Sequence, residues 1–337
     1  MASTSQRPRR VTRNDVAKRA GVSPAVVSYV INQSKYVSPE KTEAVKKAIE
    51  ELQYRPNVQA RSLRTNRSMQ IAFVCDNLRN DWLEDAEKIL FEKGYYVSHC
   101  YTRDGDDFIN SLIDRQFDAI FMMSNRFTAR QLNVIADMHI PLVLYRSRVY
   151  EGLDSSVVTV APDIYEGVRQ SVNYLAFKGH EHIALIPPLR YRTEGMESDG
   201  FRARAYIDAM KQNGLETDDF YICRNVDSID DMISDVFGML ISGKKERPTA
   251  FITGNDYTAI KIISYIKSLG MRVPEDIAVM GSDNTYIAEM SSPSITTVDF
   301  PKEEFCRKLA DTLLELMDGK SPADEYIKVS LVVRESA

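Results

Sequence analysis

The chain has 337 residues, of which 44% are hydrophobic and 27% charged, and its formal net charge is -5. This length predicts roughly two or three domains, and the composition is that of an ordinary globular protein. No apolar run approaches the roughly 18 residues needed to span a bilayer, and no apolar stretch follows the Arg-rich opening MASTSQRPRR. We therefore expect a cytoplasmic protein that does not contact the membrane.

The average charge conceals an asymmetry between the two parts of the chain. Residues 1–70 contain 14 Lys or Arg against 5 Asp or Glu, whereas the remainder contains 29 against 43. A basic end on an acidic body indicates a protein that meets a polyanion at one end only. We interpret residues 1–10 as a disordered basic tail, but from Val11 onward the apolar residues become periodic, which indicates a folded unit.

A first short helix is predicted from the residues that follow. Thr12 and Asp15 have the spacing of a capping box, although Asp is shorter than the usual Glu. Val16, Ala17 and Ala20 then recur at helical spacing. Together they predict a short amphipathic helix.

Two further helix starts follow at short intervals. Gly21 suits the left-handed end of the first helix, and Ser23-Pro24 supplies an N-cap with proline at the first helical position. Val26, Val27 and Val30 are expected to form the inner face of this second helix. Ser38-Pro39 begins a third helix. Three short helices with one apolar seam predict a helix-turn-helix unit, in which the second helix can enter the major groove of DNA.

At these residues the chain resembles a known family. VTRNDVAKRAGVSPAVVSYVIN, VSPEKTEAVKKAIEELQYRPN and VQARSLRTNRS are similar to the head and hinge of the lactose-repressor family of bacterial transcription regulators. The resemblance implies a DNA-binding head over residues 11–55, followed by a hinge helix and linker over 56–68. It implies DNA contacts from Thr12, Ser23, Pro24, Ala25, Ser28, Tyr29, Asn32, Ser38, Arg61, Leu63 and Arg64.

The chemistry of these positions suggests different roles. Pro24 has no donor and Ala25 offers only a methyl group, so Tyr29 is the expected polar reader of bases. Ser23 and Ser38 are either phosphate contacts or helix caps, and the two roles are compatible. The resemblance implies that Leu63 enters the minor groove as an apolar wedge, beside Arg61 and Arg64 near phosphates. It also implies a homodimer on a two-fold double-stranded operator.

The rest of the chain predicts an α/β body over residues 69–337. Apolar runs alternate with helix-like segments, as in MQIAFVCD, FDAIFMMS, FYICRN, PTAFITG and DIAVMGSD. This alternation predicts parallel sheets with helices on both faces, and about nine such runs are too many for one small sheet. We expect two doubly wound lobes, similar to the periplasmic sugar-binding proteins whose fold the family shares. Lobe 1 is expected over about 69–160 and 299–325, and lobe 2 over about 161–298 and 326–337.

Ligands of such folds bind at the carboxyl ends of strands, in the cleft. The family resemblance implies an effector site formed by Asp76, Trp82, Arg146, Asn255, Asp256, Asp283 and Phe300. Asp256 is either a cleft residue or the N-cap of its helix. Trp82, the sole tryptophan, is either a stacking platform or a packing residue.

One position departs from the family pattern. Where the family has an arginine three residues before its GF pair, this chain reads ESDGF, with Glu197 at that position. A carboxylate there disfavours an anionic ligand and favours a neutral polyol or a cation, unless Arg146, Arg190 or Arg192 compensates. Loss of small-molecule control is the other possibility.

No catalytic or metal motif is present in the sequence. The four cysteines contain no C-x-x-C pair, so we expect reduced, mostly buried thiols at Cys75, Cys100, Cys223 and Cys306. His180 and His182 have no third ligand nearby in sequence, and no nucleophile-elbow, zincin, P-loop or dinucleotide motif occurs. We expect a non-enzyme with no metal and no cofactor.

Three functions therefore remain open. The first is a transcription repressor that binds its operator as a dimer and responds to a small-molecule effector, a sugar or another neutral polar metabolite. The second is the same regulator controlled by a protein partner, which Glu197 and the short, irregular first lobe leave open. The third is a solute-binding receptor, against which the basic head argues.

Overall fold

The computed structural model describes residues 11–55, 67–76, 83–188, 200–223, 228–241, 243 and 245–337. The chain divides into two compact units, a head (Met1–Ser68) and a body (Met69–Ala337). The described part of the head contains three helices, α1 (Arg13–Ala20), α2 (Pro24–Asn32) and α3 (Pro39–Glu51).

The helices of the head begin and end where the sequence predicts. Thr12 and Asp15 form the capping box: Asp15 Oδ2 accepts from Thr12 N at 2.8 Å, and Thr12 Oγ1 accepts from Asp15 N at 3.3 Å. Gly21 ends α1 in the left-handed conformation, with φ 64°. Ser23 caps α2 by accepting from Val26 N at 3.4 Å.

The head encloses a small core between its three helices. Its buried residues are Val16, Ala17, Val27, Val45 and Ala48. Val30 and Ile31 pack against this core, but Val26 does not belong to it. The predicted inner face of α2 is therefore wrong at Val26, because the helical period brings Val27, Val30 and Ile31 onto one side.

The body contains two sheets in the part of the chain that the structure describes. The first has six strands in the order β10-β5-β4-β3-β1-β2, all parallel. Its strands are β1 (Gln70–Cys75), β2 (Tyr96–Tyr101), β3 (Ala119–Met123), β4 (Leu142–Leu144), β5 (Val158–Pro162) and β10 (Glu325–Ile327).

The second sheet has five strands in the order β11-β9-β8-β7-β6. It is parallel except that β11 runs antiparallel to β9. Its strands are β6 (Ile183–Ile186), β7 (Ala250–Thr253), β8 (Ala278–Ser282), β9 (Thr296–Asp299) and β11 (Ser330–Val332).

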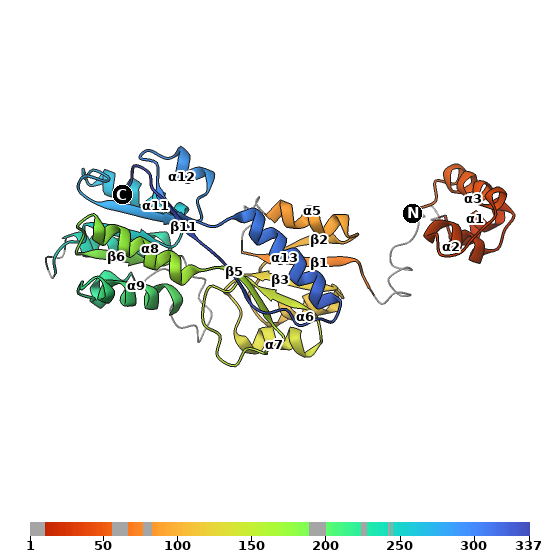
Figure 1. Cartoon of the computed structure of the whole chain (residues 1–337), viewed down its shortest axis with the longest axis horizontal. Coiled ribbons are helices and arrows are strands. Elements are labelled where there is room, and N and C mark those ends of the chain that lie inside the picture. The colour runs from red at the N-terminus through yellow and green to blue at the C-terminus, as the bar shows by residue number, and fades with distance from the viewer. Residues whose placement is uncertain are drawn as a thin grey trace, which may run out of the picture. The chain divides into compact units, whose positions relative to one another are not determined.

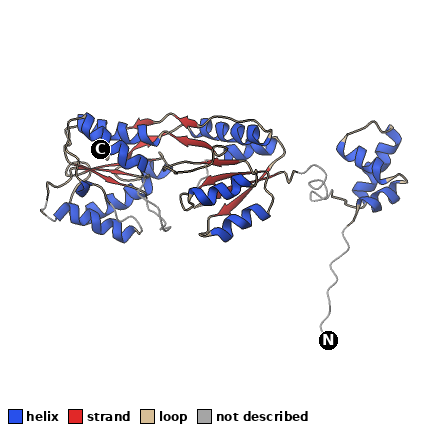
Figure 2. Ribbon diagram, turned by 90° about the horizontal axis from the view of Figure 1, so that it is seen from below, coloured by secondary structure: helices blue, strands red, loops and turns tan. Residues whose placement is uncertain are grey.

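Helices cover both faces of each sheet (Figures 1 and 2). Those packed on the first sheet are α5 (Glu84–Glu92) and α13 (Lys302–Met317) on one face and α6 (Asp106–Asp114) and α7 (Ala129–Asp137) on the other. Those packed on the second sheet are α8 (Ile164–Phe177) and α9 (Gly200–Gln212) on one face and α10 (Ile229–Ile241), α11 (Asp256–Ser268) and α12 (Tyr286–Met290) on the other. Because both faces are covered, the central strands β1, β3, β4, β6 and β7 are mostly apolar and buried, whereas the edge strand β2 is partly exposed.

The chain passes between the two sheets at three described places. It leaves the first sheet after β5, returns through α13 after β9, and leaves again between β10 and β11. The expected fold class, a small all-α head with a two-lobed, doubly wound α/β body, is confirmed. The last passage follows Ile327, two residues later than the lobe boundary we expected.

One predicted strand is wrong. FYICRN was expected as a strand, but Asp219–Tyr221 forms a short 3-10 helix begun by Asp218, whose carboxylate accepts from Phe220 N at 2.8 Å. Up to Cys223, where the described range ends, only an isolated bridge between Ile222 and Leu185 follows. An apolar run without a continuous hydrogen-bonded neighbour cannot extend a sheet.

The described helices and cysteines can be compared with the expectations from the sequence. None of the helices in these ranges is both long and apolar enough to cross a membrane. Cys75, Cys223 and Cys306 are buried free thiols, and Cys100 is half-buried.

Candidate functional site

The first turn of α2 is an exposed part of the predicted DNA-reading surface. Ser23, Pro24 and Ala25 are all exposed, while Val27 one turn further in is fully buried. The helix is thus anchored by its inner side and presents its N-terminal residues outward. This is the geometry that groove reading by a recognition helix requires.

The next turn of α2 is held by contacts within the head. Asn32 Nδ2 donates to the carbonyl oxygen of Ser28 at 2.8 Å and lies 3.2 Å from Ser28 Oγ. Lys35 Nζ lies 5.1 Å from the centre of the Tyr29 ring. A cation over this ring places positive charge beside the expected base-reading residue.

The remaining predicted DNA contacts are of two kinds. Thr12 is exposed and caps α1, whereas Ser38 precedes α3 without a side-chain capping bond. The side chain of Ser23 therefore makes a capping hydrogen bond, whereas the side chain of Ser38 makes none. Arg61, Leu63 and Arg64 lie outside the described residues, as does the tail over residues 1–10.

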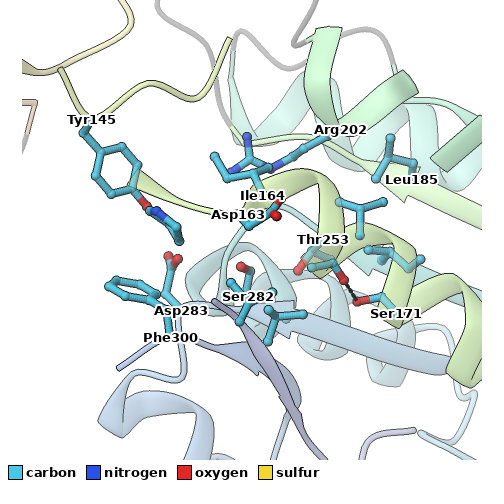
Figure 3. Close-up of a pocket in the computed structure, with 17 residues that line it drawn as sticks. Tyr145, Asp163, Ile164, Ser171, Leu185, Arg202, Thr253, Ser282, Asp283 and Phe300 are labelled. Atoms are coloured by element: carbon cyan, nitrogen blue, oxygen red, sulfur yellow. Dashed lines mark hydrogen bonds between the residues drawn. The ribbon is translucent and has the colours of Figure 1, made fainter. Parts of the chain in front are cut away.

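A pocket that is partly open to solvent lies at the carboxyl ends of β7 and β8 (Figure 3). Residues from both lobes border it. Tyr145 follows β4 of the first sheet, Arg202 comes from α9, and Asp283 and Phe300 follow β8 and β9. In Figure 3 the hydroxyl of Tyr145 and the carboxylate of Asp283 point toward the same space.

Asp283 has the most unusual environment of the pocket residues. Its φ of 96° is a left-handed conformation that costs a non-glycine residue about 1–3 kcal/mol and that tends to occur at functional sites. Burial raises the pKa of its carboxyl to about 6, and the negative charge of Asp256 adds to the rise, while Arg202 and Lys302 oppose it. Burial also raises the pKa of Tyr145.

The structure places two of the six described effector candidates at this pocket, Asp283 and Phe300. Phe300 is 4% exposed, and Lys302 Nζ lies 4.9 Å from the centre of its ring. Trp82 and Glu197 lie outside the described residues.

Asp256 does not border the pocket, because it is buried inside the second lobe. It accepts hydrogen bonds from Thr285 N at 2.7 Å, Thr285 Oγ1 at 2.9 Å and Thr297 Oγ1 at 2.6 Å. Gly281 on β8 makes room for it, since a Cβ there would lie 2.2 Å from Asp256 Oδ1. The N-cap of α11 is Asn255, which accepts from Thr258 N at 2.8 Å.

Asp76 and Arg146 do not border the pocket, and their side chains contact other groups. Asp76 accepts from Ser124 Oγ at 2.8 Å and lies 3.1 Å from Arg126 Nε. Burial raises the pKa of Asp76, although Ser124 and Arg126 oppose the rise. Arg146 Nε donates to the carbonyl oxygen of Arg148 at 3.3 Å.

Sequence reasoning missed Tyr145 and Arg202. Tyr145 follows β4 directly, so the rule that ligands meet the carboxyl ends of strands could have found it. The family resemblance selected the next residue, Arg146. Arg202 lies two residues beyond Gly200 in α9, and no local signal distinguishes it from the other arginine of the segment, Arg204.

The two histidines considered as metal ligands have other neighbours. His180 Nδ1 lies 2.9 Å from Thr249 Oγ1, and the ring of His182 stacks on Tyr221 with centroids 5.8 Å apart. Within the described ranges no group of three metal-ligating side chains occurs.

Comparison with known proteins agrees with this architecture. Residues 12–57 match the family described as bacterial regulatory proteins, lacI family, and residues 172–337 match the periplasmic binding protein-like domain. The HTH-type transcriptional repressor PurR of Serratia proteamaculans (strain 568) is 30% identical over 336 residues, which cover 96% of each chain. PurR of Vibrio vulnificus (strain CMCP6) is 29% identical, over 96% of this chain and 98% of that protein.

Solved structures show the same fold. The complex of the transcriptional regulator CelR with cellobiose is 26% identical, with a TM-score of 0.69, over 97% of this chain and 100% of that chain. The lac repressor dimer bound to operator and the anti-inducer ONPF is 23% identical, with a TM-score of 0.82, over 97% and 99%.

The chain belongs to the lacI family of bacterial regulatory proteins. It is a DNA-binding transcription regulator and not an enzyme.

Proposed function

We propose that this protein is a cytoplasmic transcription repressor that binds a palindromic operator as a homodimer and is controlled by a small-molecule effector in the body pocket. The observation that carries the proposal is the α1–α2 pair, whose turn at Gly21 leaves the first residues of α2 exposed over a buried anchor at Val27. The curated relatives at 28–30% identity that cover 96% of this chain are transcriptional repressors, which supports repression.

The role that we propose for each DNA-contacting residue of the head follows from the chemistry of its side chain. Ala25 offers a methyl contact, such as to thymine, and the hydroxyl of Tyr29 can donate to or accept from a base edge. Ser23, Ser28, Asn32 and Ser38 would contact phosphates or the sugar, which fixes the register without reading sequence. Thr12 would do the same from the start of α1.

The dimer follows from the small size of one reading helix. The nine residues of α2 span only about 13 Å, so one head meets few base pairs. Two heads related by a two-fold axis would double the contacts and require a palindrome. We propose that Leu63, flanked by Arg61 and Arg64, wedges between the two half-sites in the minor groove.

The pocket supports control by a small molecule rather than by a protein partner. It is concave, and it holds the half-buried carboxylate of Asp283 at its border. We propose Asp283 and Phe300 as effector contacts, joined by Tyr145 and Arg202. Asp76, Arg146, Asn255 and Asp256 would then support the site from outside its lining.

The proposal is tested by measuring the affinity of the full chain for duplex DNA at several salt concentrations, with Leu63→Ala beside the wild type. We expect a steep fall of affinity with salt, because counterions are released when the head neutralises phosphates. Leu63→Ala should weaken binding to the selected operator and spare binding to unrelated duplex. A flat salt dependence would contradict groove binding, and an equal loss on both duplexes would remove the wedge.

A further inference from the structure

The loop that follows α2 brings a lysine back to the DNA-reading helix. Gln33 ends α2 in the left-handed conformation, with φ 51°, which lets the chain leave the helix axis. Two residues later, Lys35 Nζ lies 5.1 Å from the centre of the Tyr29 ring. Lys35 is exposed, and the next residue, Tyr36, is 89% exposed. The loop therefore presents a cation and an aromatic ring at the surface of the head, beside α2.

Tyr29 lies on the side of α2 that points away from the core of the head. Successive residues of a helix are rotated by about 100°, so Ala25, Tyr29 and Asn32 share one side of α2. Val27, which is buried in the core, lies on the opposite side. When a helix enters the major groove, its outward side meets the base edges. The ammonium of Lys35 therefore lies on the side of α2 where base edges are expected.

The other side chains on this side of α2 offer few hydrogen-bond donors. Ala25 carries only a methyl group. Asn32 Nδ2 donates to the carbonyl oxygen of Ser28 at 2.8 Å and lies 3.2 Å from Ser28 Oγ, so its amide donors are engaged within the helix. The hydroxyl of Tyr29 and the ammonium of Lys35 are therefore the donors best placed to reach a base.

We infer that Lys35 determines part of the operator sequence by donating to O6 and N7 of a guanine in the major groove, while the Tyr29 ring holds its ammonium in place. Guanine presents two acceptors on this edge, whereas adenine and cytosine present a donor there and thymine a single acceptor beside a methyl group. An ammonium has three donors and no acceptor, so guanine matches it best. This inference rests on the proposed function, because it assigns one base of the operator that the head would bind.

A contact with a phosphate is the alternative role for an exposed lysine. Such a contact fixes the register of the head and does not read sequence. The position of Lys35 over Tyr29, on the outward side of α2, favours a base instead. The attraction between the ammonium and the ring also restricts an otherwise flexible side chain. A donor that is already restricted loses less conformational freedom on binding, so it can discriminate between bases more strongly.

The test uses the full chain to select duplexes from a library of randomised sequence, followed by sequencing of the bound fraction. Wild type, Lys35→Ala and Lys35→Arg are compared at one salt concentration, because salt changes the contribution of every phosphate contact. We expect the wild type to select a palindrome with a guanine at one fixed position of each half-site. Lys35→Ala should lose this preference by at least about fivefold, whereas Lys35→Arg should keep it, since arginine also pairs with guanine.

Two further comparisons locate the contact. Lys47→Ala is the matched control, because Lys47 is an exposed lysine of α3 outside the expected DNA contacts, and it should leave the preference at every position unchanged. Replacing the selected guanine by 7-deazaguanine removes the N7 acceptor from the major groove and leaves the phosphates intact. This replacement should weaken binding of the wild type several-fold and have little effect on Lys35→Ala.

The base preference of Lys35→Ala separates a base contact from a phosphate contact. Weaker binding by the same factor on all sequences, or an unchanged preference, would overturn the inference and leave the proposed repressor intact. A selected half-site without guanine would overturn it as well. If the wild type selects no palindrome, the proposed function itself fails, and the role of Lys35 fails with it. Thermal unfolding of Lys35→Ala should match that of the wild type, because Lys35 is exposed, so a lost preference would not reflect an unfolded head.

Discussion

The head and the body differ in how far apart in sequence their functional residues lie. The reading surface of the head is contained in one short segment, and its shape depends on bonds three or four residues apart, such as Thr12–Asp15 and Ser28–Asn32. The pocket of the body combines Tyr145 and Val329, which are brought together by two sheets. A binding surface formed by one short segment can therefore be predicted from the sequence. A pocket whose residues lie far apart in sequence can be recognised only once the tertiary structure is known.

The largest expected effect comes from a substitution that disrupts the head and leaves the body intact. Val27→Asp buries an unpaired charge in the small core of the head, and we expect DNA affinity to fall by more than about 100-fold. The thermal unfolding of the body should stay unchanged. Phe177→Asp, which adds the same charge at a position 85% exposed in the body, is the control and should preserve DNA binding. Equal losses in both variants would mean that added charge, not the fold of the head, decides affinity.

The next prediction concerns the pH dependence of the body. The carboxyl of Asp283 has a pKa of about 6 in the folded protein, above its ordinary value of 3.8, so its ionisation opposes folding. The penalty is absent below about pH 4, grows between about pH 4 and 6, and is constant above, where it reaches at most about 3 kcal/mol.

Asp283→Asn should therefore stabilise the ligand-free body at pH 7 by up to about 3 kcal/mol and have little effect at pH 4. Urea unfolding of wild type and variant at several pH values measures the difference. Asp256, Asp299, Arg202 and Lys302 also act on this carboxyl, so only the difference between the two proteins is interpreted. A gain that does not depend on pH would contradict the raised pKa.

A smaller effect is expected from the hydrogen bonds of the buried Asp256. Thr297→Val removes the hydroxyl that donates to Asp256 at 2.6 Å and should destabilise the body by about 2 kcal/mol. Thr258→Val is the matched control, because Thr258 Oγ1 is buried with no hydrogen-bond partner among the described residues. Removal of the Thr258 hydroxyl should leave the free energy of unfolding in urea unchanged or raise it. Similar losses for the two variants would show that Asp256 does not depend on its donors.

The smallest effect compares two capping boxes, one in each unit. Thr12 caps α1 of the head, and Thr128 caps α7 of the body with Gln131 as its partner. Replacing either by Ala should cost about 1 kcal/mol of stability in its own unit. Only Thr12→Ala should also lower DNA affinity, by a few-fold. If the two variants bind DNA equally well, Thr12 is a cap and not a DNA contact.

Most of the fold could be predicted from the sequence, because its signals are local. The capping pair Thr12–Asp15, Gly21 at φ 64° and the proline that begins α2 fix the head. The alternation of apolar runs with helices fixes the class of the body. The error at FYICRN arose because a strand needs a hydrogen-bonded neighbour, and the sequence does not say whether Ile222 finds one beyond Leu185.

The pocket could be predicted only in part. Asp283 and Phe300 directly follow strands and lie where that position suggests. Asp256 has a similar position after β7, yet it points into the lobe, because the room left by Gly281 and the hydroxyls of Thr285 and Thr297 hold it there. Such partners are tens of residues away in sequence, so local patterns cannot reveal them.

The most direct test of the central claim, that the head reads a specific DNA sequence, is selection of bound fragments from sheared genomic DNA of the source organism. The full chain and Val27→Asp are compared under the same conditions. We predict that the wild type enriches a palindrome with a flexible central step and that the variant enriches nothing. Enrichment of the same fragments by both proteins, or of none by the wild type, would contradict the account.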